Sequence, residues 1–133
     1  MARTGEPALT HLDTHLVCWL YNGEAAKLSA TAKAAIESAA NLEISPVVEL
    51  ELHFLHEIGR FLHPPEEALR VMAEQFNLAI SLTPFRQVTR AARPLTWTRD
   101  PFDRLIAAHA IAANAPLITK DRLIRKHCPN ALW

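Results

Sequence analysis

Residues 8–13 read Ala8-Leu9-Thr10-His11-Leu12-Asp13, an apolar run of strand length that ends in an acid, and a helical pattern follows over residues 14–21. Further apolar runs of this length alternate with helical segments along the chain. Such alternation favours a parallel sheet covered by helices on both sides. We therefore predict an α/β fold with a central, mostly parallel sheet.

The predicted elements carry recognisable start signals. Ser29 is a good N-cap, and Ser45 followed by Pro46 places a proline at the first position of another helix, where its missing N–H costs nothing. The predicted strands cover residues 8–12, 42–44, 78–82, 117–119 and, at an edge of the sheet, 131–133. The predicted helices cover residues 14–21, 30–40, 46–60, 66–76, 84–92, 101–115 and 122–126.

Length and composition are those of a globular protein. The chain has 133 residues, of which half are hydrophobic and only 3 are glycine, so we expect one domain over residues 1–133 with a single core. The longest apolar stretch, residues 16–21, is far shorter than the roughly 20 residues of a membrane span. The start of the chain lacks the regions of a signal peptide. We expect a cytoplasmic protein without a membrane segment.

Cysteine and charge usage add two expectations. Cys18 and Cys128 are too few for a disulfide framework, so we expect two buried thiols. The net charge is zero, but residues 1–85 hold 5 Lys and Arg against 11 Asp and Glu, whereas residues 86–133 hold 9 against 3. The basic half could bind phosphates, or it could simply be a solvated face that balances the acidic one.

Four acids stand where the pattern predicts apolar side chains: Asp13, Glu51, Asp103 and Asp121. Asp13 and Asp121 follow predicted strands, and Glu51 and Asp103 lie in the first turns of predicted helices. Ligands of open α/β sheets gather at the carboxyl ends of the strands, so we expect the four acids to converge there. Clustered carboxylates repel one another, and a bound divalent cation is the simplest compensation. Hard Mg²⁺ or Mn²⁺ takes such oxygen ligands in phosphodiester cleavage.

The choice of Glu51 rests on the face that it occupies in the predicted helix 46–60. Apolar residues spaced as on one helical face predict the buried side, and Glu51 falls on that side, whereas Glu49 falls on the opposite, polar side. The apolar residues of the predicted face are Val47, Leu50, Phe54, Leu55 and Ile58.

Helix capping is the competing explanation for three of these acids. Asp100-Pro101-Phe102-Asp103 has the form of an N-cap, a first-turn proline and an acid at the third position, a good helix start in itself. Asp121 could cap the short helix that follows it, and Asp13 could cap the helix from Thr14. The capping explanation is weakest for Glu51.

Other kinds of site have weaker support. The histidines and cysteines lack zinc spacing, and the chain has neither a Gly-rich phosphate loop nor a G-x-S-x-G elbow. A phosphoryl-transfer enzyme with Asp13 as nucleophile would be better supported by an acid at position 15, where this chain has His15.

The chain resembles PIN-domain ribonucleases, and specifically the VapC-type toxins of bacterial toxin–antitoxin pairs. The resemblance spans nearly the whole chain and departs from the family around Glu51, where Val48-Glu49-Leu50 replaces a Ser-Trp pattern and leaves Glu49 as a rival. Its motifs are Leu12-Asp13-Thr14-His15 with Trp19-Leu20, Leu28-Ser29, Arg99-Asp100-Pro101-Phe102-Asp103-Arg104-Leu105-Ile106, Leu117-Ile118-Thr119-Lys120-Asp121 and Leu132-Trp133.

The resemblance implies a three-layer α/β/α sandwich, a Mg²⁺- or Mn²⁺-dependent endoribonuclease, a homodimer and inhibition by a small antitoxin. It implies metal binding by Asp13, Glu51, Asp103 and Asp121. We further expect Thr14 and Thr119 to support the site through their hydroxyls, and Arg99, Arg104 or Lys120 to contact RNA phosphates. The alternative is a catalytically silent module of the same fold that acts by binding a partner protein.

Overall fold

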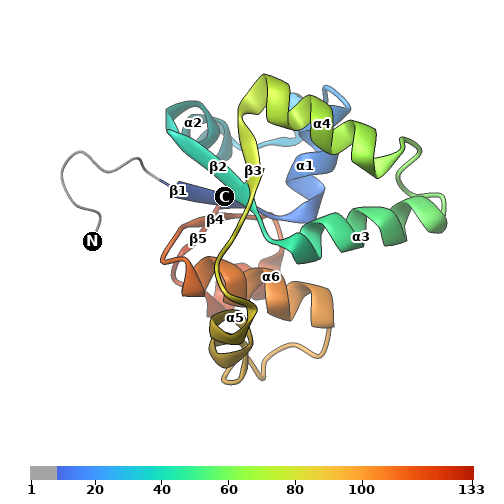
Figure 1. The fold of residues 1–133 in the computed structure, drawn as a ribbon. Coiled ribbons are helices and arrows are strands. Elements are labelled where there is room, and N and C mark those ends of the chain that lie inside the picture. The colour runs from blue at the N-terminus through green and yellow to red at the C-terminus, as the bar shows by residue number, and fades with distance from the viewer. Residues whose placement is uncertain (1–8) are drawn as a thin grey trace.

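The computed structural model describes residues 9–133 and contains a five-stranded sheet in which every neighbouring pair of strands is parallel (Figure 1). The spatial order is β3-β2-β1-β4-β5, which confirms the predicted parallel sheet. Ala8 and the segment expected to lack a signal peptide lie outside the described residues. The strands are β1 (Leu9–Leu12), β2 (Asn41–Ile44), β3 (Leu78–Ile80), β4 (Leu117–Ile118) and β5 (Ala131–Leu132).

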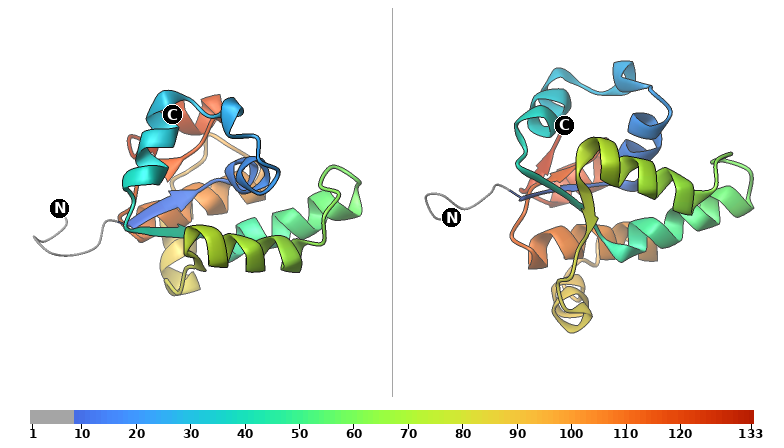
Figure 2. Two further views of the ribbon diagram at one scale, coloured as in Figure 1. Left: turned by 90° about the horizontal axis from the view of Figure 1, so that it is seen from above. Right: turned by 45° about the horizontal axis from the view of Figure 1, so that its top comes forward.

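Helices cover both faces of the sheet, so the fold is the expected three-layer α/β/α sandwich. In Figure 1, α1, α2 and α4 lie above the sheet and α5 and α6 below it, and Figure 2 shows the same layers from two further directions. A short 3-10 helix, Ala25–Lys27, was not predicted. The α-helices are α1 (Thr14–Tyr21), α2 (Ala30–Ser38), α3 (Pro46–Glu57), α4 (Pro65–Phe76), α5 (Phe85–Ala92), α6 (Pro101–Ala112) and α7 (Arg122–His127).

The register of the strands aligns their carboxyl ends. His11 pairs with Glu43 on one side and with Leu117 on the other. The segments that follow β1, β2 and β4 therefore leave the sheet at one edge, and the helices α1, α3 and α7 begin from that edge. Ligand sites of open parallel sheets form at this edge.

The helix starts at Ser29 and Ser45 are those that the sequence predicts, whereas α4 and α5 begin one residue away from the predicted positions, at Pro65 and Phe85. The Ser29 hydroxyl accepts a hydrogen bond of 3.0 Å from the backbone N–H of Ala32, and Ser45 accepts one of 3.1 Å from that of Val47. These caps satisfy N–H groups that have no partner inside the helix. The far end of α3 differs from the prediction, since the helix stops at Glu57 and Gly59 follows with a positive φ of 78°.

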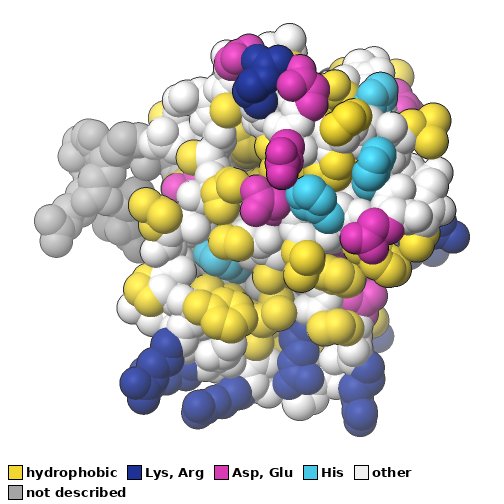
Figure 3. All heavy atoms as spheres, turned by 45° about the vertical axis from the view of Figure 1, so that its right-hand side comes forward, with side chains coloured by type: hydrophobic (Ala, Val, Ile, Leu, Met, Phe, Trp, Pro, Cys, Tyr) yellow, Lys and Arg dark blue, Asp and Glu magenta, His cyan; other side chains and the backbone are white. Residues whose placement is uncertain are grey.

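The buried face of α3 is not the predicted one. Val48 and Leu52 are fully buried, whereas Leu50, Phe54 and Ile58 are exposed by 60%, 44% and 50%. Apolar residues cover more than half of the helix circumference, so their spacing alone allows two neighbouring faces, and packing selects the face of Val48 and Leu52. Figure 3 shows hydrophobic side chains gathered across the middle of this side of the molecule, above Lys and Arg side chains along its lower edge.

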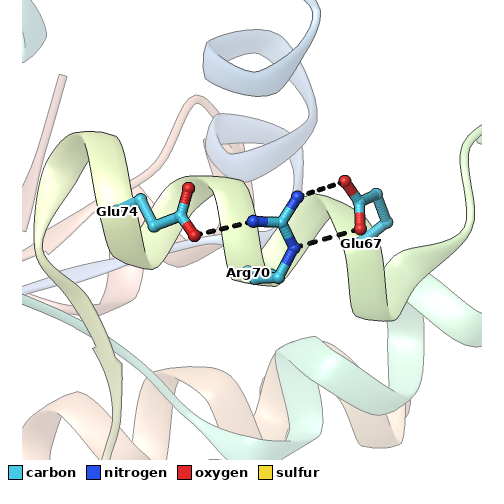
Figure 4. Close-up of polar contacts among 3 residues, drawn as sticks. All are labelled: Glu67, Arg70 and Glu74. Atoms are coloured by element: carbon cyan, nitrogen blue, oxygen red, sulfur yellow. Dashed lines mark hydrogen bonds and ion pairs between the residues drawn. The ribbon is translucent and has the colours of Figure 1, made fainter.

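The outer face of α4 carries a network of exposed ion pairs. The Arg70 guanidinium donates to both oxygens of Glu67, at 2.5 and 3.1 Å, and to Glu74 at 2.6 Å (Figure 4). The spacing of three and four residues places all three side chains on one helical face. Solvent screens such pairs, so they add solubility more than stability.

Cys18 and Cys128 are both free; Cys128 is buried, but Cys18 is only half-buried because α1 presents it near the edge of its packed face. Burial, with Glu51 and Asp13 nearby, raises the pKa of the Cys18 thiol to about 11. Within residues 9–133, no helix has the length and apolar character required to cross a bilayer.

Candidate active site

A cleft of about 390 Å³ opens at the carboxyl ends of β1 and β4 and brings the four predicted acids together. Three further residues of the lining were not predicted for the site, namely His15, Trp19 and Asp100. Asp100 was assigned to capping, and no local signal in the sequence distinguishes His15 and Trp19 from other residues of a helix such as α1. The lining residues are Asp13, His15, Trp19, Glu51, Asp100, Asp103, Lys120 and Asp121.

Asp13 lies at the base of the cleft and is only 5% exposed. One carboxylate oxygen accepts the backbone N–H of Thr14 at 2.7 Å, and the other accepts the hydroxyl of Thr119 at 2.6 Å. Burial raises the pKa of Asp13, and these two hydrogen bonds oppose the rise because they favour the charged form. Asp13 is thus both the N-cap of α1 and a member of the cleft.

Glu51 reaches the cleft from the second turn of α3. The fully buried Thr14 donates its hydroxyl to a carboxylate oxygen of Glu51, which links this glutamate to the segment of Asp13. Burial raises the pKa of Glu51, and the charge of Asp13 adds to the rise. Glu49 is not among the residues that line the cleft.

Asp103 and Asp100 enter the cleft together at the start of α6. Asp100 caps this helix, accepting the backbone N–H groups of Phe102 at 2.8 Å and of Asp103 at 3.1 Å. Within residues 9–133, no group donates a hydrogen bond to the Asp103 carboxylate. Burial first, and then the charges of Asp100 and the other cleft acids, raise the pKa of Asp103 to about 7.

Asp121 joins the cleft from the start of α7 and caps that helix by accepting the N–H of Ile124 at 2.9 Å. Its own N–H donates to the hydroxyl of Thr119 at 3.0 Å. Thr119 therefore connects Asp13 with the Asp121 segment through one buried side chain. Capping and membership of the cleft coexist at Asp13 and Asp121, so the two explanations offered for these acids do not exclude each other.

Among the basic residues expected near the site, only Lys120 lines the cleft. The Arg104 guanidinium instead donates to the backbone carbonyls of Ala92 at 2.9 Å and Arg93 at 3.0 Å, at the end of α5. Arg99 is exposed and does not belong to the lining. Residues 9–133 therefore contribute five carboxylates and a single lysine to the cleft, a strong excess of negative charge.

The donor set suits a hard divalent cation more than a soft one, since it consists almost wholly of carboxylate oxygens. Across residues 9–133, no three Asp, Glu, His or Cys side chains stand close enough to coordinate one ion by themselves. This spacing is compatible with Mg²⁺, which commonly keeps several waters and binds proteins through one or two carboxylates. The oxygen donors, the charge excess and the raised pKa of Asp103 fit such an ion.

Comparison with known proteins gives one consistent assignment. Residues 11–128 match the PIN domain family. The chain is 36% identical over 118 residues to Ribonuclease VapC22 of Mycobacterium tuberculosis, an alignment that covers 87% of this chain and 89% of that protein. The chain belongs to the PIN-domain family, among the relatives of the VapC ribonucleases.

Solved structures share the fold at lower sequence identity. One is VapBC2 from Rickettsia felis bound to a DNA fragment from its promoter, with a TM-score of 0.64, 22% identity, and coverage of 93% of this chain and 96% of that one. Another is a toxin–antitoxin complex from Klebsiella pneumoniae, with a TM-score of 0.63, 16% identity and the same coverages. At these identities the likeness establishes the three-layer fold.

Proposed function

We propose that this chain is a metal-dependent endoribonuclease, the toxin of a toxin–antitoxin pair, which hydrolyses RNA phosphodiester bonds in the acid cleft and acts in the cytoplasm. The observation that carries the proposal is the convergence of Asp13, Glu51, Asp103 and Asp121 in one cleft, where Lys120 is the one Lys or Arg that residues 9–133 contribute to the lining. The 36% identity to a protein named as a ribonuclease supports the activity. The solved relatives that are toxin–antitoxin complexes support a small antitoxin as partner.

In this proposal Mg²⁺ or Mn²⁺ is held by one or two of the four acids together with water. The bound ion would supply an activated water and offset the charge of the scissile phosphate. Thr119 and Thr14 fix the carboxylates of Asp13 and Glu51 in place through their hydrogen bonds. Lys120 is placed to contact a phosphate of the RNA. Single-stranded loops are the expected targets, because their unstacked bases can be read.

The test is incubation of the purified protein with structured cellular RNAs in Mg²⁺ or Mn²⁺, beside EDTA and the variants Asp13→Asn and Asp103→Asn. Glu37→Gln, an exposed acid outside the cleft, is the matched control. We expect discrete fragments from the wild type and Glu37→Gln, and none with EDTA or with either Asp variant. Retained cleavage by folded Asp103→Asn would remove this acid from the mechanism.

A catalytically silent binding module is the second candidate, and one feature of the cleft favours it. Asp13 and Glu51 already accept threonine hydrogen bonds, and a partner's arginines could neutralise the remaining charge instead of a metal ion. Intact RNA after incubation with folded protein free of bound partner would favour this module. Turnover of RNA would exclude it.

A further inference from the structure

A second hollow, of about 500 Å³, lies beside the C-terminal strand and carries a concentration of positive charge. Arg122, Arg125 and Lys126 of α7 line it together with Trp133. All three basic residues are exposed, and in the described part of the chain none of them forms an ion pair. Their charges are therefore available to a ligand.

Two tryptophans and a lysine join this hollow to the acid cleft. The Lys120 ammonium lies 5.9 Å from the ring centre of Trp19 and 6.0 Å from that of Trp133, within the range of a cation–π contact. The two indole rings are 6.1 Å apart and tilted by 55°. Trp19 and Lys120 line the acid cleft, whereas Trp133 lines the hollow. The acids, the aromatic rings and the basic side chains of α7 form one continuous surface.

The chemistry of this surface selects its ligand. A strand with phosphates along its backbone and exposed bases needs positive side chains for the former and aromatic faces for the latter. Lys120 and the α7 residues supply the charges, and Trp19 and Trp133, both only partly buried, supply the rings. A duplex has no free base faces, so the pairing of rings with charges favours a single strand.

We propose that single-stranded RNA leaves the acid cleft across Trp19, Lys120 and Trp133 and lays its backbone against Arg122, Arg125 and Lys126. This inference rests on the proposed function, since it extends the substrate path of the same nuclease. On this path, the hollow lined by α7 is the main binding site for the nucleotides that lie outside the acid cleft. The basic side chains of α5 lie outside both hollows and have no part in the path.

The test compares two double variants with equal loss of charge. Arg122→Gln/Arg125→Gln removes one charge from the first turn and one from the last turn of α7, and Arg86→Gln/Arg90→Gln does the same on α5, where both arginines are also exposed. Fluorescence anisotropy in EDTA measures the Kd of a ten-nucleotide single-stranded RNA as a function of salt. We expect the α7 variant to raise Kd about tenfold and the α5 variant to change it less than twofold.

The salt dependence and a cross-link give independent readings. Loss of two phosphate contacts should reduce the slope of log affinity against log salt by about 1.4, since each contact with a single strand contributes about 0.7. RNA carrying 5-iodouridine should cross-link under ultraviolet light to Trp133, as identified by mass spectrometry. Equal loss of affinity in both variants, or an unchanged Kd and slope with no Trp133 cross-link, overturns the proposal.

Cleavage by the wild type is assayed separately, so the two proposals can fail independently. RNA that binds through α7 but is never cut contradicts the nuclease while the binding path stands. RNA that is cut equally well, with an unchanged KM, by the α7 variant contradicts the path while the nuclease stands. If the α7 variant binds RNA as tightly as the wild type but no longer binds an acidic peptide, the hollow is a binding site for a partner protein and the inference is overturned.

Discussion

Thr119 is the residue on which the geometry of the acid cleft depends most directly. Its side chain is fully buried, donates to Asp13 and accepts from the backbone N–H of Asp121. Thr119→Val keeps the shape of the side chain but removes both hydrogen bonds, so the Asp13 carboxylate and the Asp121 N–H lose this partner. We expect it to lower the free energy of unfolding by about 1–3 kcal/mol and to reduce RNA cleavage. Urea denaturation and a cleavage assay measure the two effects.

Thr119→Ser is the matched control, because it keeps the hydroxyl and loses only a methyl group. We expect Ser to retain most of the cleavage activity and to cost about 1 kcal/mol or less. If Thr119→Val retains as much cleavage activity as Thr119→Ser, the hydroxyl of Thr119 does not position Asp13.

At the scale of elements, the start of α6 combines capping with charge repulsion at Asp100. Asp100→Ser keeps an N-cap oxygen but removes the second-largest cause of the raised pKa of Asp103. We expect stability within about 0.5 kcal/mol of wild type and a lower Asp103 pKa, whereas Asp100→Ala should cost about 1 kcal/mol through the lost cap. Urea denaturation and NMR titration of the Asp103 carboxyl measure these changes. An Asp103 pKa that stays near 7 in Asp100→Ser would show that burial and the other cleft acids raise it without Asp100.

The helix α3 offers a direct test of its corrected buried face. Leu52→Ala removes a fully buried side chain and should lower the free energy of unfolding by about 2–5 kcal/mol. Leu50→Ala makes the same chemical change at a site that is 60% exposed in the single chain, and it should alter the stability of the monomer by less than about 0.5 kcal/mol. Urea denaturation of the two variants decides between the faces. The opposite ranking would restore the face that the sequence pattern predicted.

Local signals in the sequence were sufficient to predict features that depend on one residue and its immediate neighbours. Ser29, Ser45 and Asp100 cap helices as predicted, because an N-cap depends on the side chain and the next three residues. The facing of α3 could not be predicted, because it depends on which neighbours pack against a helix that is apolar over much of its circumference. The role of Arg104 was missed for a similar reason, since its carbonyl partners lie 11 and 12 residues earlier in the sequence.

The residues of the candidate site also differ in whether a local signal in the sequence could find them. Asp13, Asp103 and Asp121 could be placed at the cleft from the sequence, because each is an acid at the end of a predicted strand or at the start of a predicted helix. Glu51 also lines the cleft, although the helical face on which it was selected is not the buried one. His15 and Trp19 could not be singled out, because a histidine and a tryptophan are ordinary residues of a helix such as α1. Only the alignment of strand ends by the sheet shows that the first turns of α1 lie beside the acids.

For the whole molecule, the homodimer implied by the family resemblance remains a prediction, and the exposed stripe of α3 gives it a testable surface. Leu50, Phe54 and Ile58 lie at intervals of four residues, so they share one face, which is covered in part by the stacking of Phe54 on Phe102. We expect Phe54→Asp to shift the protein from dimer to monomer in analytical ultracentrifugation. Leu123→Asp, an exposed apolar site on α7, should leave the dimer intact. A wild type that is monomeric at micromolar concentration would contradict the dimer.

The charge excess of the acid cleft should make the stability of the whole metal-free protein depend on pH. The pKa of Asp103 is about 7 in the folded protein against an ordinary value of 3.8, so its protonated form stabilises the fold at low pH, and this stabilisation is lost as the pH rises through 7. Asp103 is only half-buried and solvent screens its charge, so we expect a loss of about 1–2 kcal/mol between pH 5 and pH 8. Urea denaturation in EDTA at the two pH values measures it.

Asp103→Asn isolates this contribution from the other titrating groups. Burial, with the neighbouring His109, lowers the pKa of His11 to about 4, so His11 favours the folded state at higher pH and opposes Asp103 in the wild type. The difference between wild type and variant cancels that effect and should show the wild type losing more stability as pH rises. Millimolar Mg²⁺ should stabilise the wild type more at pH 8 than at pH 5, because protons and the cation compete for the same carboxylates. Equal pH dependence in wild type and variant, with no stabilisation by Mg²⁺ at pH 8, would contradict both the charge excess and the proposed metal site.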